Sequence, residues 1–118
     1  MWLLDNATVY EDGQPLTAGW TIEGRGQAFR ISAPDVEYVA RPDGFLATKM
    51  TVSGPADSVR IKRQGRSWFV LYDDHMIAKY SKSRFVVFEE SDRVLPTQDL
   101  LIAAALVCWK MEHPDVYI

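Results

Sequence analysis

The amino-acid sequence predicts a mainly β domain in which an antiparallel, strongly curved sheet or barrel wraps around one hydrophobic C-terminal helix. Before residue 96, short segments rich in Val, Ile, Tyr, Phe and Trp alternate with Gly and Pro, which is typical of strands joined by turns. Ten apolar residues then follow one another at positions 100–109, and a helix that is apolar on every side has to be enclosed. From the spacing of the turn residues we expect about eight or nine strands.

The clearest strand candidates are four consecutive segments in the second half of the chain, at residues 58–63, 67–72, 76–80 and 84–89. Connections this short permit only antiparallel pairing. Polar and apolar residues alternate in the first segment, so Val59 and Ile61 are expected to face inward while Arg60 and Lys62 face outward. Five earlier segments have the same character, at residues 7–10, 17–23, 27–31, 36–41 and 45–52.

The helix is expected at about residues 97–112, within a single domain that spans residues 1–118. Pro96 is tolerated at the edge of a helix, Thr97 is a good N-cap, and Asp99 places a negative charge in the first turn. Pro114 ends the segment. A curved sheet would bury all faces of this helix, whereas a flat sheet would cover one side; a two-layer arrangement with a packed helix stays open as an alternative.

Residues 68–111 carry a resemblance to a known family. The stretch WFVLYDDHMIAKYSKSRFVVFEESDRVLPTQDLLIAAALVCWKM is similar to the end of LURP-one-related domains, which belong with phospholipid scramblases to the tubby C-terminal-like superfamily. The resemblance implies an antiparallel barrel with a hydrophobic helix threaded through its centre. The basic residues that bind phosphoinositides in tubby domains are not matched one by one to positions of this sequence, so the fold is carried over and no binding residues are.

The cysteine count, the first residues and the length of the apolar run indicate the cellular compartment and the redox chemistry that are to be expected. The single cysteine, Cys108, cannot form an internal disulfide, and the first residues lack the basic and apolar regions of a signal peptide. The apolar run is shorter than the roughly 20 residues that a membrane-spanning helix needs. We therefore expect a cytoplasmic protein without a transmembrane segment.

Basic residues gather between positions 58 and 84, although the chain as a whole has a formal charge of −3. Only Asp73 and Asp74 oppose them there. Such a patch would suit an acidic protein surface or anionic lipid headgroups, and it could also be a solvated outer face of the sheet. The candidate binding residues are Arg60, Lys62, Arg63, Arg66, Lys79, Lys82 and Arg84.

Catalytic, metal and cofactor chemistry has little support in the sequence. His75 follows two carboxylates, but the available nucleophile, Cys108, lies in the apolar helix, where burial suppresses thiol reactivity. Two histidines and one cysteine show no zinc-type spacing, no phosphate-binding loop is recognisable, and the acidic balance disfavours nucleic acid. We expect no enzyme, no metal and no cofactor.

The function predicted from the sequence is a non-enzymatic binding module for a protein partner, and an inhibitor- or immunity-type role would suit a small, slightly acidic domain. The alternative is peripheral binding of anionic phospholipid headgroups through the basic strands at 58–84. The apolar tail at 115–118 is a further candidate, either as an edge strand or as a ligand for a partner's groove.

Overall fold

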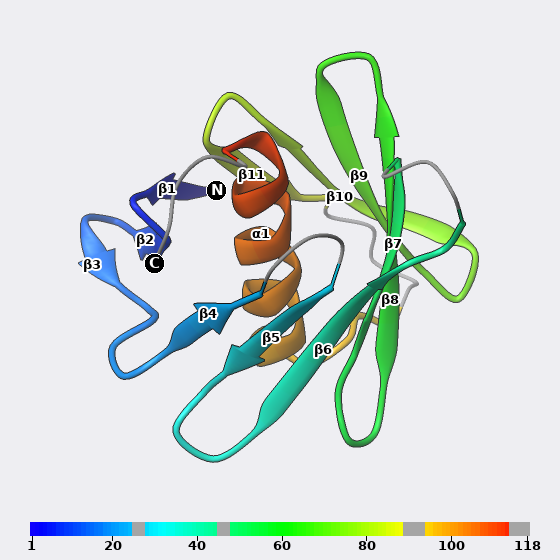
Figure 1. Ribbon diagram of the computed structural model, residues 1–118. Coiled ribbons are helices and arrows are strands. Elements are labelled where there is room, and N and C mark those ends of the chain that lie inside the picture. Colours follow the sequence, from blue (N-terminus) through cyan, green and yellow to red (C-terminus); the bar gives the residue numbers. More distant parts are fainter. Residues whose placement is uncertain (25–27, 45–47, 89–93, 114–118) are drawn as a thin grey trace.

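The computed structural model describes residues 1–24, 28–44, 48–88 and 94–113, and in these residues eleven strands form one antiparallel sheet (Figure 1). Neighbouring strands follow the order β3-β2-β1-β11-β10-β9-β8-β7-β6-β5-β4. The strand bounds are β1 Trp2–Asp5, β2 Thr8–Glu11, β3 Gln14–Pro15, β4 Thr21–Glu23, β5 Phe29–Ser32, β6 Glu37–Pro42, β7 Lys49–Ser53, β8 Ser58–Gln64, β9 Ser67–Tyr72, β10 His75–Ser81 and β11 Arg84–Val87.

Helix α1, Gln98–Glu112, occupies the centre of the curled sheet (Figure 1). It contacts β1 and β2 near one end of the strand order and β6, β7 and β8 in the other half, so the sheet surrounds it. Every residue from 100 to 109 is buried, with at most 5% of its surface exposed. The small residues at 103–105 let the sheet approach closely. The predicted fold class is confirmed, and so is the reason for the missing polar face of the helix.

Local signals start and stop the helix where the sequence predicts. The Thr97 hydroxyl accepts a hydrogen bond from the backbone N–H of Leu100 at 3.4 Å, and Asp99 lies in the first turn. At the other end, the backbone N–H of His113 donates to the carbonyls of Trp109 and Lys110. No helix within the described ranges is long and apolar enough to cross a membrane.

Tight two-residue hairpins connect most of the strands that carry the candidate site. Asp73 and Asp74 join β9 to β10, and Lys82 and Ser83 join β10 to β11; all four have positive φ, as a type I′ turn requires. Gly65, with a φ of 62°, opens the β8–β9 turn at the position where a type II′ turn needs glycine. These turns set the register of β8 to β11.

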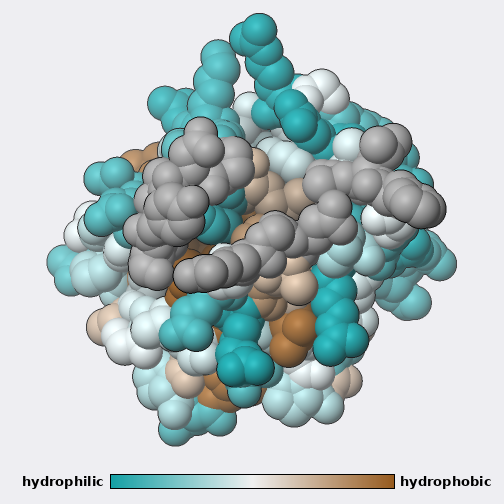
Figure 2. All heavy atoms as spheres, viewed as in Figure 1, coloured by the Kyte–Doolittle hydropathy of each residue, from teal (hydrophilic) through white to brown (hydrophobic). Residues whose placement is uncertain are grey.

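The sheet in the described residues ends at β3 and β4 and does not close into a barrel (Figure 1). Figure 2 shows the same side of the molecule, where brown apolar atoms are visible at the centre among hydrophilic ones. The nine predicted strands correspond to β2 and β4–β11, and the structure adds β1 and the two-residue β3. Strand β3 has only two residues, and the first three residues of β1 are all apolar, so neither strand shows polar and apolar alternation in the sequence. The predicted strand residues 45–47 and 89 and the tail at 115–118 lie outside the described residues.

Candidate interaction surface

The two halves of the sheet differ in charge. Strands β7 to β11 contain six basic and no acidic residues, whereas β1 to β6 contain four acidic and two basic residues. Because side chains alternate between the faces of a strand, most of these cations point away from α1. We call the outer surface of β7–β11 the basic face; its exposed cations are Lys49, Arg60, Lys62, Lys79 and Arg84.

Strand register aligns the cations in a row across the basic face. Lys62 on β8 lies opposite Phe69 on β9, and Phe69 lies opposite Lys79 on β10. The Lys79 ammonium sits 5.9 Å from the centre of the Phe69 ring. Lys49 on β7 extends the row, because it is paired directly with Lys62. Two lysines that face each other across neighbouring strands repel each other and destabilise the sheet. A surface with a purely structural role would gain nothing from such a pair.

An apolar strip runs between these cations along β9. Its members are Phe69 and Leu71, both half-buried, and Met76 of β10, which is 37% exposed and paired with Leu71. Met76 reaches the outer surface because the register of β10 shifts between Met76 and Ala78, so that Ile77 and Ala78 are both buried. The strip therefore has cations of β8 on one side and Lys79 of β10 on the other.

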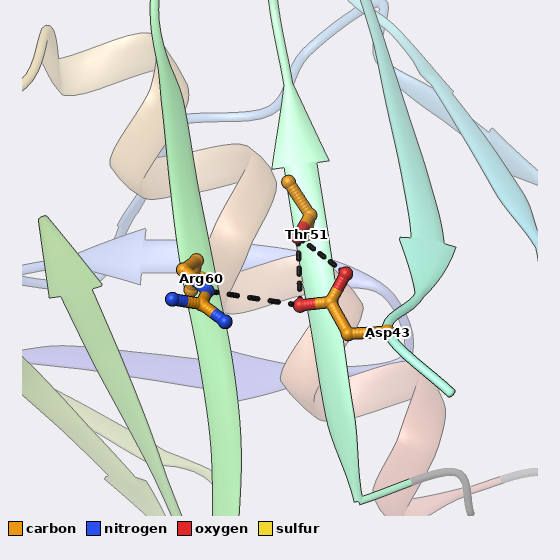
Figure 3. A network of polar contacts seen from close by, with 3 residues as sticks. All are labelled: Asp43, Thr51 and Arg60. Carbon is orange, nitrogen blue, oxygen red and sulfur yellow. Dashed lines mark hydrogen bonds and ion pairs between the residues drawn. The ribbon is translucent and has the colours of Figure 1, made fainter. Parts of the chain in front are cut away.

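Arg60 is held by the one carboxylate that reaches over this face among the described residues. Thr51 of β7 donates its hydroxyl to both Asp43 oxygens, at 2.7 and 2.8 Å, and the Arg60 Nε lies 3.8 Å from Asp43 Oδ2 (Figure 3). The Arg60 side chain stays 62% exposed. Asp43 thus orients Arg60 at one border of the basic face and neutralises part of its charge.

The other predicted binding residues lie at the end of the hairpins or at the far border. The Arg63 Nε donates to the carbonyl of Gly65 at 3.0 Å, and its guanidinium lies 5.4 Å from the centre of the Trp68 ring. Arg66 and Lys82 are exposed in the β8–β9 and β10–β11 turns. Arg84 is on β11, paired with Ser81 and with Leu3 of β1.

The structure therefore brings Arg60, Lys62 and Lys79 together and places the remaining four predicted residues around them. Sequence reasoning missed Lys49, because its pairing with Lys62 depends on the register between β7 and β8. It also missed the apolar strip, since aromatic and aliphatic residues were expected mainly in the core. The signal that could have revealed the strip is that Phe69 and Leu71 alternate with Trp68 and Val70, so the two pairs must face opposite sides of β9.

A separate cavity of about 620 Å³ lies near the β9–β10 turn, where it is lined by residues that include Asp57, Tyr72 and His75. The Tyr72 hydroxyl donates to Asp57 Oδ2 at 2.8 Å, and this hydrogen bond, together with desolvation and the nearby carboxylates, raises the pKa of Tyr72 above its usual value. No group of three metal-ligating side chains occurs within the described ranges.

Cys108, the nucleophile considered from the sequence, is fully buried in α1. Burial raises the pKa of its thiol, with the charge of Glu112 adding to the effect. His75, by contrast, is exposed. The described residues therefore offer no reactive thiol beside this histidine.

No protein-family model matches the chain, and searches of curated proteins and of solved structures likewise found no match. The resemblance of residues 68–111 to the tubby C-terminal-like superfamily stays a prediction.

Proposed function

We propose that this protein is a non-enzymatic binding module that recognises a protein partner through the basic face. The observation that carries the proposal is the segregation of charge: five adjacent strands hold six basic and no acidic residues in a chain whose formal charge is −3. A single-sign surface of this kind attracts an oppositely charged partner and speeds encounter.

The cost of this arrangement supports a role in binding. Lys49 and Lys62 are directly paired, and like charges in such positions destabilise a sheet by a few tenths of a kcal/mol up to about 1 kcal/mol. One acidic residue at either position would remove the repulsion. A solvated outer face with no partner gives no reason to keep both lysines, whereas a carboxylate-rich partner would use them together.

A catalytic role has less support. The buried thiol of Cys108 and the exposed imidazole of His75 do not form a nucleophile–base pair. The inhibitor- or immunity-type role belongs to the same proposal, since such proteins act by covering a partner's surface.

Anionic lipid is the alternative ligand, because lysines beside exposed apolar side chains also suit a membrane surface. The acidic turns count against it. Asp57, Asp73 and Asp74 lie at one end of the strands that form the basic face. A flat anionic membrane laid on this face would come within about a Debye length of them, which is about 8 Å at physiological ionic strength.

Affinity capture with matched variants tests the proposal. The wild-type protein, Lys62→Glu and Lys79→Glu are immobilised, with Arg30→Glu of β5 as a control that changes net charge equally in the other half of the sheet. Cell extracts and vesicles of phosphatidylcholine with phosphatidylserine are applied at low and moderate salt, and bound protein and lipid are quantified.

We expect one protein to be retained stoichiometrically by the wild type and by Arg30→Glu, and its retention to fall about tenfold with either basic-face variant. Equal retention by all four proteins would refute the basic face as the binding surface. Retention of vesicles in place of a protein would establish the lipid alternative.

A further inference from the structure

We propose that the partner presents an acidic amphipathic helix, which lies along β9 with its apolar stripe on Phe69 and Leu71 and its carboxylates on the cations at either side. This inference rests on the proposed function and adds the kind of segment that the basic face accepts. Its evidence is the order of side chains across the three strands β8, β9 and β10.

In the row that contains Phe69 the order is cation, apolar, cation. Lys62 of β8 and Lys79 of β10 both face Phe69, one from each side. In the adjoining row, Leu71 lies between Arg60 of β8 and Met76 of β10. A ligand that buries apolar side chains on β9 therefore meets Lys62 and Arg60 along the β8 edge, and on the β10 edge it meets Lys79 beside Phe69 and the apolar Met76 beside Leu71.

The width of the strip matches a helix. Neighbouring strands are about 4.8 Å apart, so the cations of β8 and β10 rise from backbones about 9.6 Å apart. A helix with its side chains has a diameter of about 10–12 Å. Acidic residues on the two flanks of such a helix would reach Lys62 and Lys79 while its apolar stripe covers Phe69.

An extended peptide fits this place less well. Strand β9 is hydrogen-bonded to β8 on one side and to β10 on the other, so it offers no free edge to which another strand could be added. The strip is available only through side chains that stand on its outer face, and helices commonly pack on a sheet in this manner.

The charges around the strip favour a protein segment over a membrane. Asp43 borders it beside Arg60, and Asp73 and Asp74 lie in the turn at the end of β9. A helix that follows β9 can place its carboxylates on the lysines and a neutral or basic residue near the acidic turn. A continuous anionic plane has no such freedom.

Three synthetic peptides of equal length provide the probes. The first is a helix with a leucine stripe bordered on both sides by glutamates; the second has the same composition with leucines and glutamates rearranged so that no stripe forms; the third replaces the glutamates by lysines. Vesicles of phosphatidylcholine with phosphatidylserine form a fourth probe. Binding to the full chain is measured by calorimetry, and the contact surface is mapped by amide chemical shifts.

We expect the first peptide to bind at least about tenfold more tightly than the second and to shift resonances of β8, β9 and β10, and we expect no binding of the third. Phe69→Ser and Leu71→Thr should each weaken binding of the first peptide about tenfold, because the anchors of the apolar stripe are removed. Both positions face outward, and circular dichroism checks that each variant is folded.

The outcomes separate this inference from the proposed function. If Lys62→Glu weakens binding while Phe69→Ser and Leu71→Thr do not, or if the rearranged peptide binds equally well, the basic face binds acidic protein but the helical partner is wrong. Failure of the striped peptide to bind, or preferential binding of the vesicles, also overturns the inference. Binding that is indifferent to Lys62→Glu and Lys79→Glu removes both proposals.

Discussion

Strands β1–β6 and β7–β11 line the same helix with the same kind of residue, and they differ on the outside. Ile31 of β5 and Ile61 of β8 are both buried against α1 or its neighbours, with at most 1% exposed surface. The outer side of β5 pairs Arg30 with Glu37 at 2.7 Å, whereas the outer side of β8 pairs Lys62 with Lys49. The residues of the inner face are thus constrained by packing around α1 in both halves. The residues of the outer face are not, so they can differ between the halves where one of them serves an interaction.

The largest expected change in stability tests whether both halves of the sheet contribute equally to the core around α1. Ile31→Ala and Ile61→Ala should each lower the free energy of unfolding by about 2–5 kcal/mol, because both leave a cavity in the shared core. Urea denaturation followed by tryptophan fluorescence measures the loss. A cost well below 1 kcal/mol for one of the two would mean that its half of the sheet is not part of the common core.

A smaller change in the free energy of unfolding is expected in the hairpin turns. Its sign should depend on the type of residue at the positive-φ position and not on which half of the sheet contains the turn. Lys82 and Asp12 both have positive φ, 51° and 50° respectively. Lys82→Asn should stabilise the protein and Asp12→Ala destabilise it, each by about 0.5–1 kcal/mol, because Asn and Asp tolerate left-handed backbone better than other side chains. Urea midpoints measure both, and changes of equal sign would contradict the turn assignment.

The smallest expected effect concerns the outer charges, and here the two halves should respond in opposite directions. Lys62→Glu should raise the free energy of unfolding by about 0.5 kcal/mol, since attraction to Lys49 replaces repulsion. Glu37→Lys should lower it by up to about 0.5 kcal/mol, because the exposed ion pair with Arg30 is lost. Urea denaturation at low salt resolves the signs.

Both charge effects should shrink at high salt, which screens exposed pairs. If Lys62→Glu leaves the free energy of unfolding unchanged or lowers it, the basic face carries no electrostatic strain, and the argument that it is kept for binding loses its support.

Much of the fold follows from local sequence signals. Alternation in residues 58–63 places Val59 and Ile61 inside and Arg60 and Lys62 outside, and the structure confirms it. The helix begins next to Thr97 as its capping signals predict. Strand β1 escaped detection because its first three residues, Trp2, Leu3 and Leu4, are all apolar, so the sequence shows no alternation although the burial pattern alternates.

The candidate site depends on pairings that local signals do not encode. Seven basic residues could be named from the chain, but Lys49 enters the row through its register with Lys62, and Asp43 reaches Arg60 from the turn after β6. Phe69 and Leu71 alternate with buried residues, yet a strand in a central position could have been covered on both faces. Their exposure follows from the absence of a second layer over β9 among the described residues.

The fold class, the position of the helix and the need to enclose it could be predicted from the amino-acid sequence alone, because ten consecutive apolar residues leave no face of the helix that water could solvate without cost. Which cations lie together, and which side chains lie between them, depends on how the strands pair in three dimensions. Register between strands is set by turns and by the shared core, so the row Lys49, Lys62, Phe69 and Lys79 exists only once four strands have paired.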